Sequence, residues 1–102
     1  TDLAAIAAAL AQAREPQAEA ARAAFNRHSP LAMACTLALL EPAPRDLAQA
    51  LAREHVAATG CLERGDFLEG VRALLIDKDR RPRWRHRDPQ AVSAADIAAV
   101  LA

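Results

Sequence analysis

The chain has 102 residues, a formal net charge of zero and 53% hydrophobic residues, more than half of which are alanine. This length fits one domain with a modest core, and the neutral charge gives no general bias toward nucleic acid or an anionic membrane surface. No apolar run approaches the roughly 20 residues needed to cross a bilayer, and no secretory signal pattern is present, so we expect no membrane partner and a cytoplasmic location.

Residues 1–28 predict a pair of helices. Thr1 or Asp2 can cap the first helix, in which Leu3 and Leu10 belong to a set of apolar residues recurring at helical spacing. Pro16 suits the first turn of the second helix, where its missing N–H group costs nothing.

Residues 29–64 predict two further helices. Ser29 followed by Pro30 is a start signal, with serine as the cap and proline in the first turn. The apolar residues from 31 to 40 occupy every side of the first helix, which indicates a helix covered all round. The second helix is expected from about residue 46 to residue 62, with one apolar stripe made of Leu47, Leu51, Ala58 and Leu62.

Residues 65–102 predict a helix, a charged connector and a short closing helix. Gly65 ends the preceding helix, and Asp66 can cap the next one. Gly70 inside that helix costs about 1 kcal/mol relative to alanine, which favours a close helix contact there. Ser93 to Asp96 resembles a capping box that opens the closing helix. The first of these helices carries a stripe that we expect to be buried: Phe67, Val71, Leu74 and Leu75.

No part of the sequence shows the pattern of a strand. There is no alternating apolar run and no Asn-Gly or Asp-Gly turn. The predicted fold class is therefore all-α, with five to six helices in a single domain over residues 1–102.

The residue types that bind metals or act as nucleophiles are scattered along the chain. His28, His55 and His86 lie far apart and form no pair at ligand spacing, so we expect no metal site. Cys35 and Cys61 show neither metal spacing nor a disulfide framework, and we expect both to be buried, reduced thiols. Neither of the usual glycine-rich phosphate motifs occurs.

The stretch from Lys78 to Arg87 holds six basic residues around Trp84, the only tryptophan. Such a run can bind single-stranded nucleic acid through phosphates and stacking. One tryptophan is a poor stacking platform and neighbouring aspartates offset part of the charge, so we expect no nucleic-acid partner. Two interpretations stay open: a solvated connector whose Trp84 fills a groove on something larger, or cations that meet an anionic ligand such as a nucleotide phosphate.

The order of residues in the last third of the chain is more specific than their types. The stretch GDFLEGVRALLIDKDRRPRW, Gly65 to Trp84, resembles the C-terminal signature of the 3-hydroxyisobutyryl-CoA hydrolase branch of the enoyl-CoA hydratase/isomerase (crotonase) superfamily. That signature reads D-F-x-E-G-V-R-A-x-L-I-D-K-D, followed shortly by P-[KR]-W. Residues 26–40 are similar to the family's Ser-Pro helix and residues 91–102 to its closing helix, while residues 1–28 correspond to a variable region.

This resemblance implies the C-terminal helical part of a crotonase-type protein without its spiral βα core. In the family, that core supplies an oxyanion hole for the thioester carbonyl and acidic side chains that handle water and protons. The resemblance therefore places no catalytic residue in this chain and no covalently bound cofactor, and it makes a coenzyme A thioester the substrate of the parent enzyme. It implies two partners, the N-terminal core and neighbouring subunits.

The resemblance also suggests which residues of this chain meet those partners. Lys78 is the nearest counterpart of a lysine that meets the nucleotide end of coenzyme A in some hydratases; the alternative is a surface lysine paired with Asp77 or Asp79. Five residues are expected to dock the helices on the core: Phe67, Val71, Leu74, Leu75 and Trp84.

The resulting expectation is the C-terminal domain of a hydrolase that acts on a short branched 3-hydroxyacyl-CoA of valine breakdown. Two alternatives stay open, namely the C-terminal domain of an enoyl-CoA hydratase or isomerase, and a free-standing helical module that binds a partner protein.

Overall fold

The computed structural model describes residues 2–102, and within them it contains helices and connecting segments only. The α-helices are α1 (Leu3–Gln12), α2 (Pro16–Arg27), α3 (Pro30–Leu40), α4 (Leu47–Arg64), α5 (Phe67–Val71) and α6 (Ala94–Val100). A π-helical turn, η1 (Arg72–Ile76), continues α5 directly, and a 3-10 turn, η2 (Pro89–Ala91), precedes α6. The predicted all-α fold class is confirmed.

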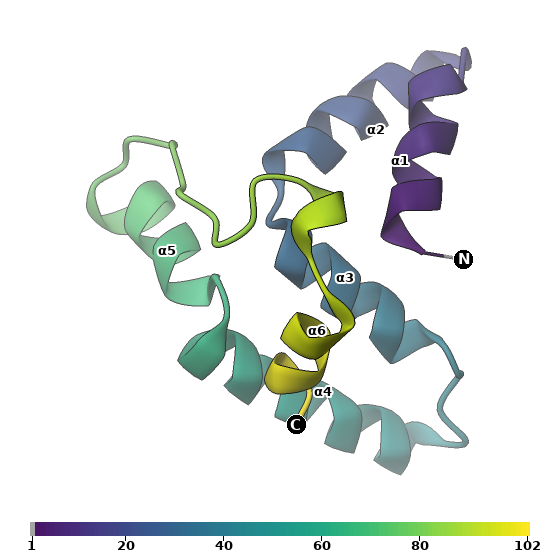
Figure 1. Cartoon of the computed structure of the whole chain (residues 1–102). Helices are drawn as coiled ribbons and strands as arrows, with labels where there is room; N and C mark the ends of the chain where they lie inside the picture. Colours follow the sequence, from purple (N-terminus) through teal and green to yellow (C-terminus); the bar gives the residue numbers. More distant parts are fainter. Residues whose placement is uncertain (1) are drawn as a thin grey trace.

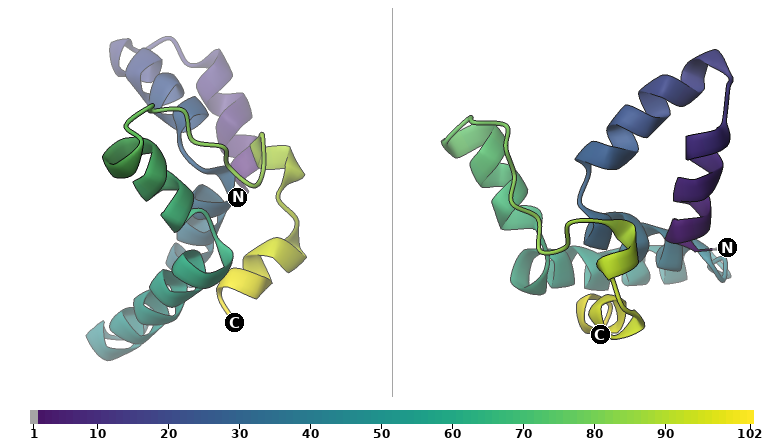
Figure 2. Two further views of the ribbon diagram at one scale, coloured as in Figure 1. Left: turned by 90° about the vertical axis from the view of Figure 1, so that its left-hand side faces the viewer. Right: turned by 45° about the horizontal axis from the view of Figure 1, so that its top comes forward.

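The helices are arranged as a base with two projections (Figures 1 and 2). α3 and α4 pack against each other, and α6 packs on both of them. α1 and α2 form a hairpin at one side, while α5 rises from the end of α4 at the other. The extended segment that follows η1 runs back between these two projections toward α6. This course returns Trp84 to the beginning of α3.

The start signals of the helices are those that the sequence predicts. Asp2 caps α1 and Ser29 caps α3, each accepting a hydrogen bond from a first-turn backbone N–H group. Ser93 and Asp96 form the capping box of α6. Thr1, the other candidate cap of α1, lies outside the described residues.

The core lies where α3, α4 and α6 meet. Leu31, Cys35 and Val100 are fully buried there, and four partly buried side chains surround them: Cys61, Val92, Ile97 and Leu101. Gly60 makes this packing possible, because a Cβ atom at that position would lie 1.8 Å from the carbonyl oxygen of Val100. The backbones of α4 and α6 therefore touch directly.

The leucine stripe of α4 lies on the outside of the molecule. Leu47 is 74% exposed, and Leu51 and Leu62 are also exposed. The buried face of α4 carries Ala57 and Gly60 instead. Small residues face α6 because leucines there would hold the two helices apart.

Three expectations about burial are wrong in whole or in part. The stripe on α5 and η1 is largely open to solvent, with Phe67 at 56%, Leu74 at 55% and Leu75 at 63% exposure. The expectation that α3 is covered all round fails along one side of the helix, where Ala32, Thr36 and Leu40 are exposed. Of the two free thiols, Cys35 is buried as expected, but Cys61 is only partly buried.

Two structural features are absent within residues 2–102. No helix in this range is both long and apolar enough to cross a membrane. No group of three or more His, Cys, Asp or Glu side chains within the same range is placed so that it could hold a metal ion.

Candidate functional site

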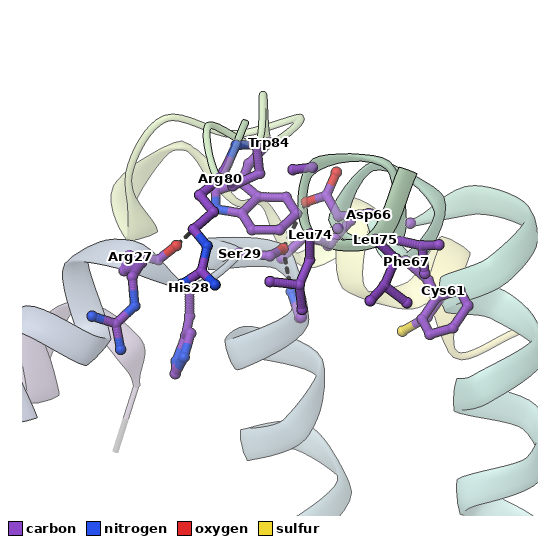
Figure 3. A pocket seen from close by; sticks show the side chains of 17 residues that line it. Arg27, His28, Ser29, Cys61, Asp66, Phe67, Leu74, Leu75, Arg80 and Trp84 are labelled. Atoms are coloured by element: carbon purple, nitrogen blue, oxygen red, sulfur yellow. Dashed lines mark hydrogen bonds between the residues drawn. The ribbon is translucent and has the colours of Figure 1, made fainter. Parts of the chain in front are cut away.

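An apolar cleft of about 610 Å³ lies between the α5–η1 segment, the beginning of α3 and the end of α4 (Figure 3). Leu31, Ala73 and Pro82 contribute to its walls. The cleft also brings together all five residues that the sequence identified for docking: Phe67, Val71, Leu74, Leu75 and Trp84. Their docking role stays a prediction.

Trp84 forms one wall of this cleft and is held there by the chain itself. Its indole N–H group donates a hydrogen bond of 3.0 Å to the carbonyl oxygen of Arg27, at the end of α2. Its ring lies over Gly70, where a Cβ atom would be 3.4 Å from the nearest ring carbon. The close helix contact expected at Gly70 is therefore a contact with the indole ring, which the returning segment brings back over α5.

Asp66 is a buried carboxylate beside the cleft, and its side chain is only 4% exposed. The hydroxyl group of Ser29 donates to its Oδ2 atom at 2.6 Å, and the backbone N–H group of Arg85 donates to its Oδ1 atom at 3.1 Å. The expectation that Asp66 caps α5 with its side chain is wrong. Both oxygens are committed to partners distant in sequence, and they tie the beginnings of α3 and α5 together.

The two thiols are chemically quiet. Burial, reinforced by the nearby Cys61, raises the pKa of Cys35 to about 11. Cys61 lines the cleft, and burial together with the charge of Asp66 raises its pKa as well. Because the thiolate is the nucleophilic form of cysteine, neither side chain is activated for covalent chemistry.

The charged segment after η1 is organised by Arg72. Its guanidinium group donates to both oxygens of Glu69, at 2.9 and 2.7 Å, and to Asp77 at 2.8 Å and Asp79 at 2.9 Å. Glu69 also accepts a hydrogen bond of 2.8 Å from the backbone N–H group of Arg83. We call these contacts the Arg72 cluster, which holds residues 77–83 against α5.

The Arg72 cluster sets the charge states of its members. The side-chain hydrogen bond from Arg72, followed by the backbone one from Arg83, lowers the pKa of Glu69 from 4.5 to about 2. A backbone hydrogen bond from Arg81 and the side chain of Arg72 lower the pKa of Asp79. These carboxylates stay ionised at neutral pH, because hydrogen bonds to the charged form favour it.

Lys78 does not pair with Asp77 or Asp79, as the surface alternative supposed, because Arg72 occupies both carboxylates. Its side chain is exposed and lies outside the cleft lining. Arg80 does line the cleft, and the sequence did not single it out. No residue type could have signalled it, since its position depends on a left-handed backbone with φ at 56°.

The chemistry that this arrangement supports is the binding of an apolar surface. Asp66 is enclosed by its hydrogen-bond donors, and the Cys61 thiol is held in its protonated form. Large apolar side chains dominate the rest of the lining, as in binding sites for apolar groups.

Comparison with known proteins agrees with the resemblance. The sequence model of the family described as "Enoyl-CoA hydratase/isomerase" matches residues 1–101. The crystal structure of an enoyl-CoA hydratase from Rhodobacter sphaeroides 2.4.1 is similar, with a TM-score of 0.92 and 44% sequence identity over 100% of this chain and 31% of that chain.

Curated relatives give the same family at lower coverage. The mitochondrial 3-hydroxyisobutyryl-CoA hydrolase of Rattus norvegicus is 39% identical over 74 residues, which are 72% of this chain and 19% of that protein. Its counterpart in Homo sapiens is 38% identical with the same two coverages. The chain thus spans about a fifth of the length of these relatives. Since the family match extends over nearly every residue of the helical fold described above, this chain belongs to the enoyl-CoA hydratase/isomerase family.

Proposed function

We propose that this chain is the C-terminal helical part of an acyl-CoA thioester hydrolase similar to 3-hydroxyisobutyryl-CoA hydrolase, and that its cleft lies against the remainder of that enzyme. The observation that supports a place within a larger enzyme is the similarity of the complete helical arrangement to 31% of a solved enzyme of this family. The signature from Asp66 to Trp84 supports the hydrolase branch, and the curated relatives carry the name of that hydrolase.

In this proposal the remainder of the enzyme carries the chemistry. It polarises the thioester carbonyl in an oxyanion hole, and acidic side chains direct the attack at that carbonyl. The helices contribute an apolar wall that keeps water away from the acyl end of the substrate. The exposure of Phe67, Leu74 and Leu75 supports a covering role, because contiguous apolar surface on a folded protein marks an interaction site.

Four finer assignments stay proposals. Lys78, exposed on the segment after η1, would meet the nucleotide end of coenzyme A. The substrate would be a short branched 3-hydroxyacyl-CoA of valine breakdown, and the protein would act in the cytoplasm together with its core and with neighbouring subunits.

The test compares this chain with a protein extended toward the N-terminus by the preceding coding sequence. Both are assayed with 3-hydroxyisobutyryl-CoA, and release of the free coenzyme A thiol is followed. We expect hydrolysis by the extended protein and none by the 102-residue chain. Hydrolysis by the short chain would show that these 102 residues carry the chemistry themselves. An extended protein that is folded but inactive would contradict the hydrolase proposal.

The second candidate is an enoyl-CoA hydratase, favoured by the similar crystal structure, which is that of an enoyl-CoA hydratase. The same extended protein distinguishes the two candidates. A hydratase removes the conjugated double bond of crotonyl-CoA and releases no thiol, whereas a hydrolase releases thiol from the 3-hydroxyacyl thioester.

A further inference from the structure

Among the charged residues that line the cleft, the acidic one has hydrogen-bond partners and the basic ones exceed it in number. Arg27, His28 and Arg80 are the basic residues of its lining, and Asp66 is the acidic one. Both oxygens of Asp66 already accept hydrogen bonds. The cleft therefore presents positive charge beside a large apolar surface.

Arg80 has no acidic partner within residues 2–102. The carboxylates nearest to it in sequence, Asp77 and Asp79, are held by Arg72 at 2.8 and 2.9 Å. Arg27 likewise forms no ion pair in the described part of the chain, and its carbonyl oxygen is used by Trp84. The residues described here thus leave two guanidinium groups at the cleft available to an outside carboxylate.

The backbone of Arg80 has a strained conformation. Its φ angle of 56° lies in the left-handed region, which an arginine adopts rarely. Its backbone N–H group donates a hydrogen bond of 2.9 Å to the carbonyl oxygen of Ala73 on η1, and the Arg72 cluster holds the residues on both sides of it. In the view of Figure 3 the Arg80 side chain lies between His28 and Trp84, at the cleft. Such backbone strain persists only where the surroundings fix it.

The apolar surface extends beyond the cleft. Leu68 and Ile76, on the same α5–η1 segment, are exposed but do not line the cavity. A small molecule in the cleft would leave them in water, whereas a polypeptide segment lying along α5 and η1 would cover them too. The extent of the surface therefore favours a protein segment as the occupant.

We propose that the cleft receives an apolar segment of the remainder of the enzyme that carries a carboxylate, and that this carboxylate pairs with Arg80. The inference rests on the proposed function. The solved hydratase has further chain from which such a segment could come, because the similarity covers only 31% of that chain. Arginine suits the role, since its planar donors bind a carboxylate in two places at once.

The experiment uses the N-terminally extended protein and footprints it with photogenerated carbene, reading the modification of Leu74 and Leu75 by mass spectrometry. The variants are Arg80→Glu, the conservative Arg80→Lys, and the matched control Arg81→Glu, whose side chain is exposed and lies outside the cleft lining. Circular dichroism of each variant checks that the helices are formed.

We expect both leucines to be protected in the extended protein relative to the 102-residue chain. Arg80→Glu should raise their modification about tenfold, because it places like charges face to face. Arg80→Lys keeps the charge but loses the two-point contact, so it should give a smaller rise of about threefold, while Arg81→Glu should stay within about twofold of the parent. Equal effects of Arg80→Glu and Arg81→Glu, with the leucines still protected, would overturn the pairing but leave the proposed function standing. Equal modification in the short and the extended chain would overturn the docking itself.

Discussion

Arg72 shows how one residue fixes a segment that has no regular structure. It joins three carboxylates, at positions 69, 77 and 79, and also donates to the carbonyl oxygen of Arg81. Single ion pairs at a surface contribute little, but here several hydrogen bonds share one planar group. A lysine could not reproduce this geometry, because its charge is concentrated at a single point.

The Arg72 cluster makes the position of Trp84 sensitive to acid. The pKa of Glu69 is about 2 in the folded chain and 4.5 ordinarily, so the folded state binds fewer protons than the unfolded state between these values. The stabilisation from Glu69 is complete above pH 4.5 and is lost as the pH falls toward 2. We expect acrylamide quenching of Trp84 fluorescence to increase over that range.

The control for this titration is Glu69→Gln, which removes the titrating group. The variant should show increased quenching already at neutral pH, and the part of the acid transition between pH 4.5 and 2 should become smaller. A quenching curve identical to that of the parent chain would mean that the cluster does not position the tryptophan.

For single residues, helix caps could be predicted from the sequence, whereas hydrogen-bond partners distant in the chain could not. Ser29 and Asp2 were identified as caps because a cap needs only the three or four residues that follow it. Asp66 was misread for the opposite reason. Its partners, Ser29 and Arg85, lie 37 and 19 residues away, and nothing in the residues next to Asp66 announces them.

Among the elements, the contact of α4 with α6 depends on Gly60, whereas Gly70 on α5 only faces the Trp84 ring. An alanine at position 60 would place its Cβ atom 1.8 Å from the backbone of Val100, so α6 would have to move. We expect Gly60→Ala to lower the free energy of unfolding by about 1–3 kcal/mol despite the higher helix propensity of alanine. Urea unfolding followed by circular dichroism measures this loss.

Gly70→Ala is the matched control, because its Cβ atom would make an ordinary contact of 3.4 Å with the indole ring. Its free energy of unfolding should be unchanged or higher by up to about 1 kcal/mol. If Gly60→Ala were as stable as Gly70→Ala, the two helices would not be in the direct contact described above.

The elements themselves were predictable, but the direction of their faces was not. Helical spacing identifies residues that share a face, as it did for Leu47, Leu51 and Leu62. It does not say whether that face turns inward. In α4 the tight approach of α6 selects Ala57 and Gly60 for the inside and leaves the leucines outside.

Across the whole molecule, the described chain leaves much apolar surface uncovered, and five of its ten exposed large apolar side chains lie on α5 and η1. We expect the 102-residue chain to enhance the fluorescence of the dye ANS, which binds exposed apolar sites. The double replacement Leu74→Gln with Leu75→Gln should reduce that enhancement, because both side chains line the cleft.

Ala58→Gln provides the comparison, since Ala58 is exposed on α4 and does not line the cleft. It should leave dye fluorescence unchanged. A double variant that binds the dye as well as the parent chain would show that the dye does not bind at the cleft.

The fold class of the whole chain followed from periodicity and from the absence of strand patterns. The five residues expected to dock on the core were identified from the resemblance together with their helical spacing, and all five line the cleft. Cleft membership of Arg80 did not follow from either, because it needs the path of the chain from η1 back to α3.

The bond between Ser29 and Asp66 has a consequence for anyone who redesigns this chain or compares it with relatives. Changing one of the two positions alone strands a polar atom in the interior, whereas a joint change to two apolar groups of matching shape can leave the free energy nearly intact. A substitution at one of the two positions therefore requires a matching substitution at the other, although 37 places separate them in the chain.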